Sequence, residues 1–317
     1  MFRRSSEMKN SILILMATLI MPLLAQAAER PAVLITGASS GIGERTTQLL
    51  AKEGFHVYAG ARKQADLDRL DAMENVDAVR LDVTVPADIE AAVDQVRKGG
   101  RGLFAIVNNA GVAILGPLIE VEESQLDFLF DVNIYGPYRI TRAFAPLLIE
   151  SEGRVVNMSS ISGVLSGVLS GPYSMSKHAL EAYNDSLALE MARVNIKVIA
   201  IEPGNFASRI GASAVRKAKE SGLDYEGSLF EKELEAGMQR LASRDAMADP
   251  IAVAKAVQQA LVSEQPKARY MVVPNQREAE VTIRKLLQET VEMNHEQPYS
   301  YDRDALVKML DEALQAL

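Results

Sequence analysis

Residues 33–43 read Val-Leu-Ile-Thr-Gly-Ala-Ser-Ser-Gly-Ile-Gly, a short apolar run that leads directly into a turn rich in glycine. The glycines fall at positions 37, 41 and 43, in the spacing Gly-x-x-x-Gly-x-Gly, and an amphipathic segment follows them. Glycine allows a tight turn and a close approach of the backbone to a phosphate, and the N–H groups that begin a helix attract that negative charge. The stretch predicts a strand, a phosphate-binding turn and a helix, with an ordinary tight turn as the alternative.

The same alternation of apolar runs and amphipathic segments continues from Pro31 along the chain. Runs such as Phe104–Val107 are apolar at every position, which is typical of strands buried on both faces of a parallel sheet. The order strand, helix, strand predicts an α/β fold, a doubly wound parallel sheet of the Rossmann type. We expect strands at 33–36, 56–59, 78–81, 104–107, 154–158, 196–201 and 270–273, and helices at 41–54, 64–73, 86–98, 121–148, 174–193 and 250–263.

This alternation stops near Gln276, after which the pattern is helical without strands. We therefore expect a single catalytic domain at 29–275 and a helical C-terminal extension at 276–317, packed on the core, whose last helix covers 304–316.

The composition excludes several kinds of function. The chain has 317 residues, of which 48% are hydrophobic and 24% charged, and its net charge is −8. An acidic chain is a poor partner for nucleic acid. The absence of cysteine excludes disulfides and thiolate chemistry, and the wide spacing of His56, His178 and His295 predicts no metal site.

Tyr173 and Lys177 stand at the expected start of a helix, where the i, i+4 spacing places both side chains on one face. A phenol can donate a proton to a carbonyl oxygen or accept one from an alcohol. Free tyrosine has a pKa of about 10, and a nearby ammonium group favours the phenolate. The pair is a candidate general acid and base, although such a pair also occurs by chance.

Other segments extend this pattern and resemble the classical short-chain dehydrogenase/reductase family. Asn108-Asn109-Ala110-Gly111 is similar to the family's second motif, and Leu81-Asp82-Val83-Thr84 to its adenine-contacting segment. Pro203-Gly204, with Ser208 where threonine is usual, resembles the nicotinamide-side motif. The resemblance covers about residues 31–275, with every landmark in the family's order.

The resemblance implies a catalytic tetrad of Asn133, Ser160, Tyr173 and Lys177. Tyr173 is then the general acid or base, and Ser160 hydrogen-bonds the substrate oxygen. Lys177 holds the nicotinamide ribose, and Asn133 helps to hold a water that links Lys177 to solvent. The neighbouring Ser159 is the alternative to Ser160.

His178 follows Lys177 in the sequence, and we expect its side chain to point away from the tyrosine face.

The cofactor is expected to be NADP(H). NAD enzymes carry an acid near the end of the second strand, but residues 56–63 contain none, and Ala61 stands where NAD-specific members have aspartate. Arg62 can instead hold a 2′-phosphate, with a solvated helix start as the alternative. The expected cofactor contacts are Thr36, Gly37, Ser39, Ser40, Gly41, Ile42, Gly43, Arg62, Asp82, Val83, Asn109, Ala110, Gly111, Tyr173, Lys177, Pro203 and Gly204.

The expected reaction interconverts a secondary alcohol and a ketone or aldehyde. The loop between Ser160 and Tyr173 carries the apolar side chains of Ile161, Val164, Leu165, Val168 and Leu169, which indicates an apolar pocket. Residues 173–204 look like the hydroxysteroid and retinol dehydrogenase branch. Segment 205–245 is expected to form a substrate lid, with Gly211, Gly222 and Gly227 as hinges.

The expected partners are a small carbonyl or alcohol substrate and further copies of the chain. By resemblance the protein is a homodimer or homotetramer, joined through the helices after strands four and five. A non-catalytic NADP(H)-binding regulator is the alternative function, which the intact tetrad argues against. A third possible function is that of a sugar-nucleotide epimerase on the related extended fold. The glycine spacing argues against it, because that group uses a different one.

The first 28 residues differ from the rest. A basic start with Arg3, Arg4 and Lys9 precedes an apolar run at 11–24 and a small-x-small site at 25–27, which predicts a signal peptide and an exported, periplasmic protein. The run is shorter than the roughly 20 residues of a membrane span. An uncleaved anchor, the only expected membrane contact, is one alternative. A cytoplasmic enzyme with a start assigned too far upstream is the other, since the periplasm is not expected to recycle a soluble nicotinamide cofactor.

Overall fold

A computed structural model of the chain describes residues 30–220, 226–243 and 247–316. The chain consists of two units, residues 1–30 and 31–317, and the folded domain lies in the second. The predicted signal peptide and Gly222 lie outside the described residues. Within those residues, no helix has the length and apolar character needed to cross a membrane.

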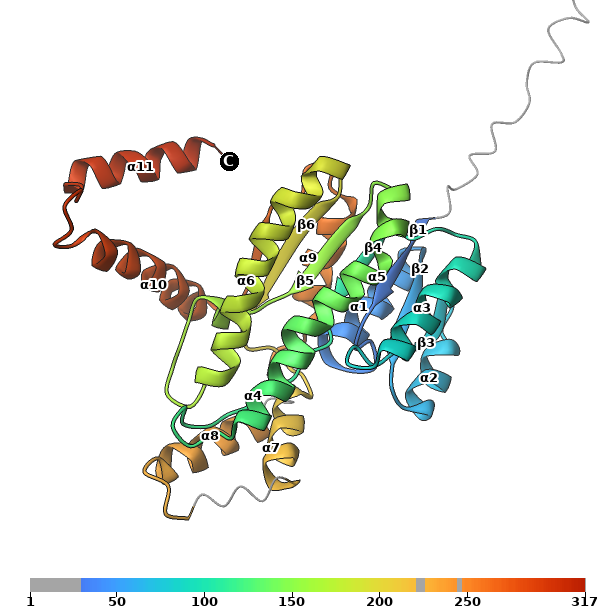
Figure 1. The fold of residues 1–317 in the computed structure, drawn as a ribbon, viewed down its shortest axis with the longest axis horizontal. Helices are drawn as coiled ribbons and strands as arrows, with labels where there is room; N and C mark the ends of the chain where they lie inside the picture. The colour runs from blue at the N-terminus through green and yellow to red at the C-terminus, as the bar shows by residue number, and fades with distance from the viewer. Residues whose placement is uncertain (1–29, 221–225, 244–246, 317) are drawn as a thin grey trace, which may run out of the picture. The chain divides into compact units, whose positions relative to one another are not determined.

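One parallel sheet of seven strands, in the order β3-β2-β1-β4-β5-β6-β7, forms the centre of the fold (Figure 1). Every predicted strand is present, and the sheet confirms the doubly wound α/β fold. The strands are β1 (Arg30–Ile35), β2 (Phe55–Ala61), β3 (Val76–Arg80), β4 (Ala105–Asn108), β5 (Arg154–Met158), β6 (Lys197–Pro203) and β7 (Arg269–Val272).

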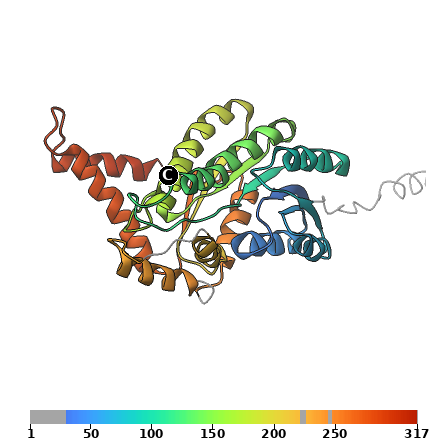
Figure 2. The same cartoon turned by 60° about the horizontal axis from the view of Figure 1, so that its bottom comes forward.

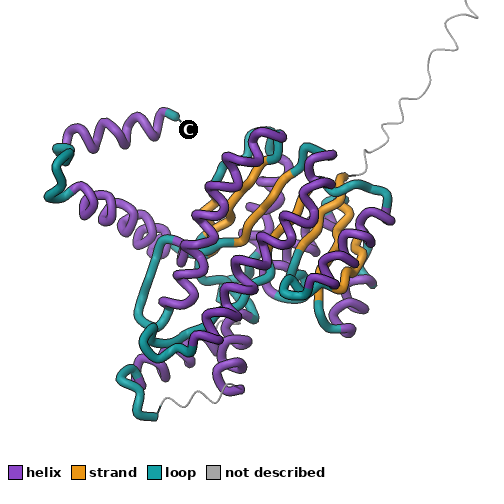
Figure 3. Tube along the Cα trace, in the orientation of Figure 1, coloured by secondary structure: helices purple, strands orange, loops and turns teal. Residues whose placement is uncertain are grey.

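Helices cover both faces of the sheet (Figures 2 and 3). The hydrophobic cluster on one face includes residues of α1 (Gly41–Lys52), α2 (Gln64–Asp71) and α9 (Ile251–Val262). The cluster on the other face includes residues of α3 (Pro86–Gly99) and α5 (Gly136–Glu150), with α6 (Gly171–Met191) packed against it.

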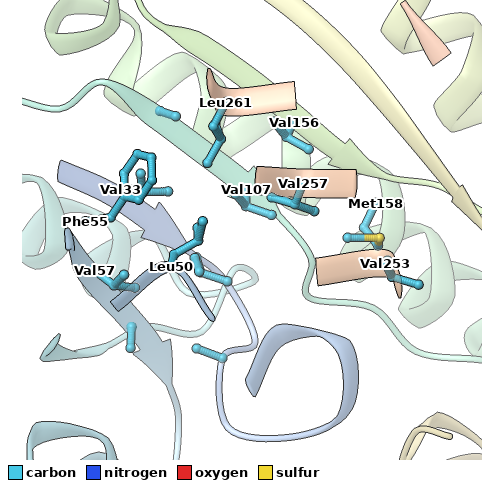
Figure 4. Packing of buried hydrophobic residues seen from close by; sticks show 14 of the residues in the cluster. Val33, Leu50, Phe55, Val57, Val107, Val156, Met158, Val253, Val257 and Leu261 are labelled. Atoms are coloured by element: carbon cyan, nitrogen blue, oxygen red, sulfur yellow. The ribbon is translucent and has the colours of Figure 1, made fainter. Parts of the chain in front are cut away.

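The continuous apolar character of the first strand follows from these two clusters. Successive side chains of a strand point to opposite faces. Val33 and Ile35 belong to the first cluster, seen in Figure 4, and Ala32 and Leu34 to the second. All four are buried, so neither face of β1 offers a place for a polar side chain.

The helix predicted at 121–148 contains an irregularity at the position of a candidate catalytic residue. It consists of α4 (Glu123–Phe130), a π-helical turn η1 (Asp131–Tyr135) and α5. Asn133 lies in the π turn and is buried. Such turns are rare and often occur at functional sites.

The remaining helices lie after β6. They are α7 (Ile210–Glu220) and α8 (Glu231–Ala242) in the predicted lid, and α10 (Gln276–Asn294) and α11 (Arg303–Gln315) in the C-terminal extension. Gly211, one of the predicted hinges, is the second residue of α7, and Gly227 occupies a turn with φ of +83°.

The extension has the predicted helices but differs in its packing. Thr282 is buried in α10, and no residue of α11 is buried among the described residues. The expected packing on the core is therefore confined to the first turns of α10.

Candidate active site

The residues of the predicted site gather at the carboxyl ends of the central strands. Thr36 follows β1, Asn109 follows β4, Ser160 stands two residues after β5, and Pro203 ends β6. The strand order reverses between β1 and β4, which is where doubly wound sheets bind their ligands.

The glycine turn between β1 and α1 requires glycine for two reasons. Gly37 and Gly41 have φ values of +64° and +57°, in the left-handed region that favours glycine. A Cβ atom on Gly43 would lie 2.3 Å from the carbonyl oxygen of Gly37, so the turn closes too tightly for a side chain.

The first turn of α1 is open to a ligand. Ser40 is the N-cap residue and makes no side-chain hydrogen bond to that turn. The N–H groups at such a helix start are a binding site for phosphate. The predicted contacts Gly41, Ile42 and Gly43 supply these groups.

The motif after β4 fastens the glycine turn to the sheet. The Asn109 side chain donates to the carbonyl oxygens of Thr36 (2.9 Å) and Gly37 (3.1 Å). The Thr36 hydroxyl accepts from the backbone N–H groups of Asn109 and Ala110, each at 3.0 Å. These side chains therefore hold the shape of the turn.

Arg62, at the end of β2, forms an ion pair with Asp82. The Nη1–Oδ2 distance is 3.4 Å, and 62% of the Arg62 side chain is exposed against 21% of Asp82. Burial raises the pKa of Asp82, but hydrogen bonds from Thr84 and the Arg62 charge outweigh it, so the net shift is downward. A mostly exposed guanidinium thus stands beside an ionised carboxylate.

Val83, another predicted cofactor contact, has its side chain in the core, where it packs against Gly136 at the start of α5. Its side chain thus has a packing role that the motif did not indicate.

Arg69 of α2 is a basic residue that the sequence reasoning missed. It donates to the carbonyl oxygen of Ser39 at 2.8 Å and pairs with Glu44 of α1. Because Ser39 lies in the glycine turn, Arg69 braces the turn from the side of α2. Its position on an exposed helix gave no signal in the sequence.

Tyr173 and Lys177 lie on one face of α6, as predicted. The Lys177 Nζ atom is 5.7 Å from the centre of the Tyr173 ring and donates to the carbonyl oxygen of Met158 at 2.7 Å. Burial lowers the pKa of Lys177 to about 8, and the nearby Glu181 carboxylate opposes this shift. A buried ammonium beside a phenol favours the phenolate form.

The two adjacent serines after β5 differ in their contacts. The Ser160 hydroxyl donates to the carbonyl oxygen of Pro203 (3.3 Å) and accepts from the Ser162 N–H (3.1 Å). The Ser159 hydroxyl is buried and makes no hydrogen bond with any described residue. Ser160 is therefore the serine that contacts the predicted nicotinamide-side motif.

Asn133 connects the π turn to the start of α6. Its side chain exchanges hydrogen bonds with the backbone of Val112 (2.9 and 3.0 Å) and donates to the Ser176 hydroxyl at 3.0 Å. Ser176 in turn donates to the carbonyl oxygen of Tyr173 at 2.7 Å. Ser176 thus joins two tetrad residues, and only its spacing from Tyr173 could have indicated it.

A buried row of asparagines was also missed. Asn108 donates to Asn157 at 2.9 Å, and Asn157 donates to Asn184 at 3.0 Å. The row crosses β4, β5 and α6 behind the tetrad, and all three residues are buried. Buried polar groups need partners, so this row holds the two strands and the helix in one arrangement.

His178 is exposed, and its Nδ1 atom lies 2.9 Å from the carbonyl oxygen of Ser174. This local contact agrees with the prediction that it points away from the tyrosine face.

Helix α8, in the predicted lid segment, contacts leucines of two loops. A Cβ on Gly237 of α8 would lie 2.8 Å from Leu115 and 3.5 Å from Leu169, and one on Gly171 would lie 2.7 Å from Leu118. The Ser228 hydroxyl donates to Glu120 at 2.7 Å, which fastens the start of the lid helix to the loop before α4. The contacts of α8 with these two loops are therefore partly apolar.

These features fit a dinucleotide. The uncapped first turn of α1 suits a pyrophosphate, and the glycine turn has no room for a side chain at Gly37 or Gly43. A doubly wound sheet with this turn and a tyrosine–lysine pair at its switch point defines an oxidoreductase of the Rossmann type.

Comparisons with known proteins agree. The family model for short chain dehydrogenases matches residues 31–219. The chain is 35% identical over 242 residues to the uncharacterised oxidoreductase YbbO of Escherichia coli K12, covering 76% of this chain and 84% of that protein. It is 32% identical over 255 residues to an NADPH-dependent 3-dehydrocapnine reductase of Ornithobacterium rhinotracheale, covering 76% of this chain and 87% of that protein.

Among solved structures, a short-chain dehydrogenase from Streptomyces avermitilis superposes with a TM-score of 0.68 and 29% identity, covering 84% of this chain and 96% of that one. The chain belongs to the short-chain dehydrogenase family, which confirms the resemblance drawn from its motifs.

Proposed function

We propose that the protein is an NADP(H)-dependent oxidoreductase that interconverts an apolar alcohol and the corresponding ketone or aldehyde, with Tyr173 as general acid and base. The observation that carries the proposal is the buried Lys177 ammonium, 5.7 Å from the centre of the Tyr173 ring. Its charge lowers the cost of forming the phenolate when the reaction runs toward the carbonyl.

In the reductive direction, the residues of the site transfer one proton to the substrate. Tyr173 donates its hydroxyl proton to the carbonyl oxygen of the substrate and becomes a phenolate. Lys177 stabilises that phenolate, and Ser160 donates a hydrogen bond to the oxygen on which negative charge develops. The bound nicotinamide supplies the hydride that the substrate carbon accepts.

The contacts of Asn133 support a positioning role. Through Ser176 it reaches the carbonyl oxygen of Tyr173, and through Val112 it reaches the loop after β4. It therefore holds the start of α6 against that loop, in addition to the water-holding role that the resemblance implies.

Two observations support NADP(H) over NAD(H). The end of β2 carries Arg62 and no acid, and the Arg62 guanidinium is mostly exposed. A guanidinium can hold a 2′-phosphate with charge-assisted hydrogen bonds. The name of the Ornithobacterium relative also specifies NADPH.

Leucines that contact α8 and the start of α6 support an apolar substrate. Leu115 and Leu169 lie against Gly237, and Leu118 lies against Gly171, two residues before the catalytic tyrosine. A steroid-like or retinol-like alcohol has the apolar surface that such residues contact.

The test uses the purified full-length chain, NADPH or NADH, and a panel of apolar ketones and aldehydes. We expect turnover with NADPH that Tyr173→Phe lowers by at least about a thousandfold, because the phenol transfers the proton to the reacting oxygen. Tyr183→Phe, on the same helix, is the matched control. NADPH binding without turnover on a broad panel would contradict the enzyme and favour a regulator.

We also propose a homodimer or homotetramer and export directed by residues 1–28. Twelve of the twenty-three exposed large hydrophobic side chains in the described residues lie on α10, α11 or their connection, which supports association. The basic start and the small-x-small site support export. Cell fractionation tests export. We expect to find the protein in the periplasm, shortened by the removal of residues 1–28.

A further inference from the structure

The loop after β6 lies against the glycine turn. A Cβ on Gly41 would be 3.2 Å from the Cβ of Ser208 and 3.3 Å from its Cα. This loop begins with Pro203 and Gly204, the segment expected to face the nicotinamide. Its backbone conformation therefore affects the nicotinamide half of the cofactor site.

Glu278 of α10 is bonded to this loop. Its Oε2 atom accepts a hydrogen bond from the backbone N–H of Asn205 at 2.9 Å. A Cβ on Gly204 would lie 2.1 Å from the same oxygen, so the carboxylate reaches the loop only because residue 204 is glycine. Gly204 also donates its N–H to the carbonyl oxygen of Val272 at 2.8 Å, which fixes the loop from the side of β7.

Glu278 is itself held in place. Its Oε1 atom accepts from the Asn275 side chain at 3.1 Å, and its N–H donates to the Asn275 side-chain oxygen at 3.0 Å. Asn275 caps α10, and a glutamate three residues after the cap usually reaches back to the N-cap backbone. Here one oxygen of that glutamate instead binds the loop after β6.

The contact between α10 and the rest of the fold is concentrated at this end. Thr282 is the buried residue of α10, and its hydroxyl donates to the carbonyl oxygen of Glu278 at 2.8 Å. Glu278 lies beyond residues 31–219, the part of the chain that the family model matches. The C-terminal extension therefore adds a carboxylate to the border of the cofactor site.

We propose that Glu278 is a positioning residue for the nicotinamide half of the cofactor, acting through the backbone of Gly204 and Asn205. The proposal rests on the proposed function, because it assumes that a nicotinamide dinucleotide binds along this edge. Within the described residues, hydrogen bonds join Glu278 to Asn205, Asn275 and Thr282, and none joins it to Arg62. The loss of Glu278 should weaken binding of the nicotinamide half alone.

The experiment measures dissociation constants by titration calorimetry for two probes, NADPH and adenosine 2′,5′-bisphosphate, which lacks the nicotinamide half. We expect Glu278→Ala to weaken NADPH binding about tenfold and to leave the bisphosphate within about twofold. Glu278→Gln keeps an acceptor oxygen and should lose less. Glu280→Ala removes a neighbouring carboxylate that pairs with Arg284 at 2.7 Å, and should change neither constant.

Thermal melting checks that each variant is folded, and Glu278→Gln keeps the test valid if the alanine variant does not fold. Unchanged NADPH affinity in both Glu278 variants would overturn the proposal, as would equal weakening of both probes. A wild-type chain that binds the bisphosphate but not NADPH would also overturn it. Failure of the wild-type chain to bind either probe would instead count against the proposed function.

Discussion

Lys177 is a charged side chain in surroundings that are unfavourable to charge. It is almost fully buried, and its ammonium donates to the carbonyl oxygen of Met158. One hydrogen bond to a neutral carbonyl compensates only part of the cost of leaving water. The lowered pKa of about 8 reflects that balance. The site thus holds an ammonium, with a pKa of about 8, 5.7 Å from the centre of the Tyr173 ring.

This arrangement predicts an alkaline limit to reduction. The Lys177 pKa is depressed below 10.5, so in the free enzyme the ammonium is lost as the pH rises through about 8. We expect kcat/KM for reduction to fall above that pH, because this constant reports ionisations of the free enzyme. The pH above which kcat/KM falls is a property of the coupled Tyr173–Lys177 pair and not of either residue alone. Ser160→Ala should lower the rate but keep the limit, and a flat profile to pH 10 in the wild type would contradict the prediction.

Arg62 predicts the cofactor preference. Removal of its guanidinium with Arg62→Ala should reduce kcat/KM for NADPH by about ten- to a hundredfold and leave NADH nearly unchanged. Arg80→Ala is a closely matched control, because Arg80 is also 62% exposed and pairs with Asp88 at 3.3 Å. Steady-state kinetics with both cofactors provides the measurement. Equal losses for NADPH and NADH would count against a 2′-phosphate contact.

Some site residues were predictable from the sequence and others were not. The glycines, Asn133, Ser160, Tyr173 and Lys177 belong to motifs with defined spacing along the chain. Ser176, Arg69 and the row formed by Asn108, Asn157 and Asn184 act through contacts between distant segments. Such contacts depend on how helices and strands pack, which spacing within one segment does not specify.

At the scale of elements, Arg269 joins the edge strand to its neighbours. It stands at the start of β7 and pairs with Glu181 at 3.1 Å and Glu202 at 3.4 Å, and also with Asp185. Glu202 belongs to β6, and the other two carboxylates belong to α6. Burial raises the pKa of Glu202 to about 7, and the Glu181 carboxylate adds to that effect while Arg269 opposes it. One cation thus neutralises only part of the negative charge.

This cluster predicts a pH-dependent stability. Because the folded pKa of Glu202 lies above its ordinary value of 4.5, its contribution is full below pH 4.5 and is lost as the pH rises through about 7. A shift of that size corresponds to about 3 kcal/mol, at 1.36 kcal/mol per pKa unit. Denaturant unfolding at pH 5 and pH 8.5 should show the loss in wild type and not in Glu202→Gln. The exposed Glu264→Gln should behave as wild type, and an unchanged loss in Glu202→Gln would contradict the assignment.

The sequence predicted the positions of the strands and helices better than the irregularities within them. All seven strands were expected, because continuous apolar runs are a strong signal where both faces of a sheet are buried. The π turn at Asp131–Tyr135 was not expected, since one extra residue in a helical turn changes the hydrophobic pattern very little. The sequence did not place Gly211 in a helix, because glycine is less favourable there than most residues, although α7 accommodates it in its first turn.

At the scale of the whole molecule, the C-terminal helices leave an apolar surface exposed. Leu286 and Leu287 of α10 and Leu310 and Leu314 of α11 are each between 45% and 60% exposed. The polar faces are largely self-neutralised by pairs four residues apart, such as Lys285–Glu289 and Lys308–Glu312. An isolated helix as short as α11, with 13 residues, is marginal in water, so burial of its apolar side would stabilise it.

A second copy of the chain is the occupant that these features favour. A two-fold axis brings the same surface of two copies together, so each exposed stripe meets an equal one and no partner charge is needed. The turn between the helices is also fixed, because Asn294 and Tyr301 exchange hydrogen bonds at 2.9 and 2.8 Å. A preformed surface loses less entropy on association than a flexible tail.

Light scattering after size-exclusion chromatography tests the association of copies through α10 and α11. We expect the wild-type mass to be that of a dimer or tetramer, and the double variant Leu310→Glu, Leu314→Glu to shift toward monomer, because it places two charges on the shared apolar face. Neither leucine is buried within one chain, so unfolding of the monomer itself should change little. Gln315→Glu, one residue further along α11, adds a charge to the polar face and should leave the mass unchanged. A monomeric wild type would refute the association, and an oligomer that survives the double substitution would move the interface away from α11.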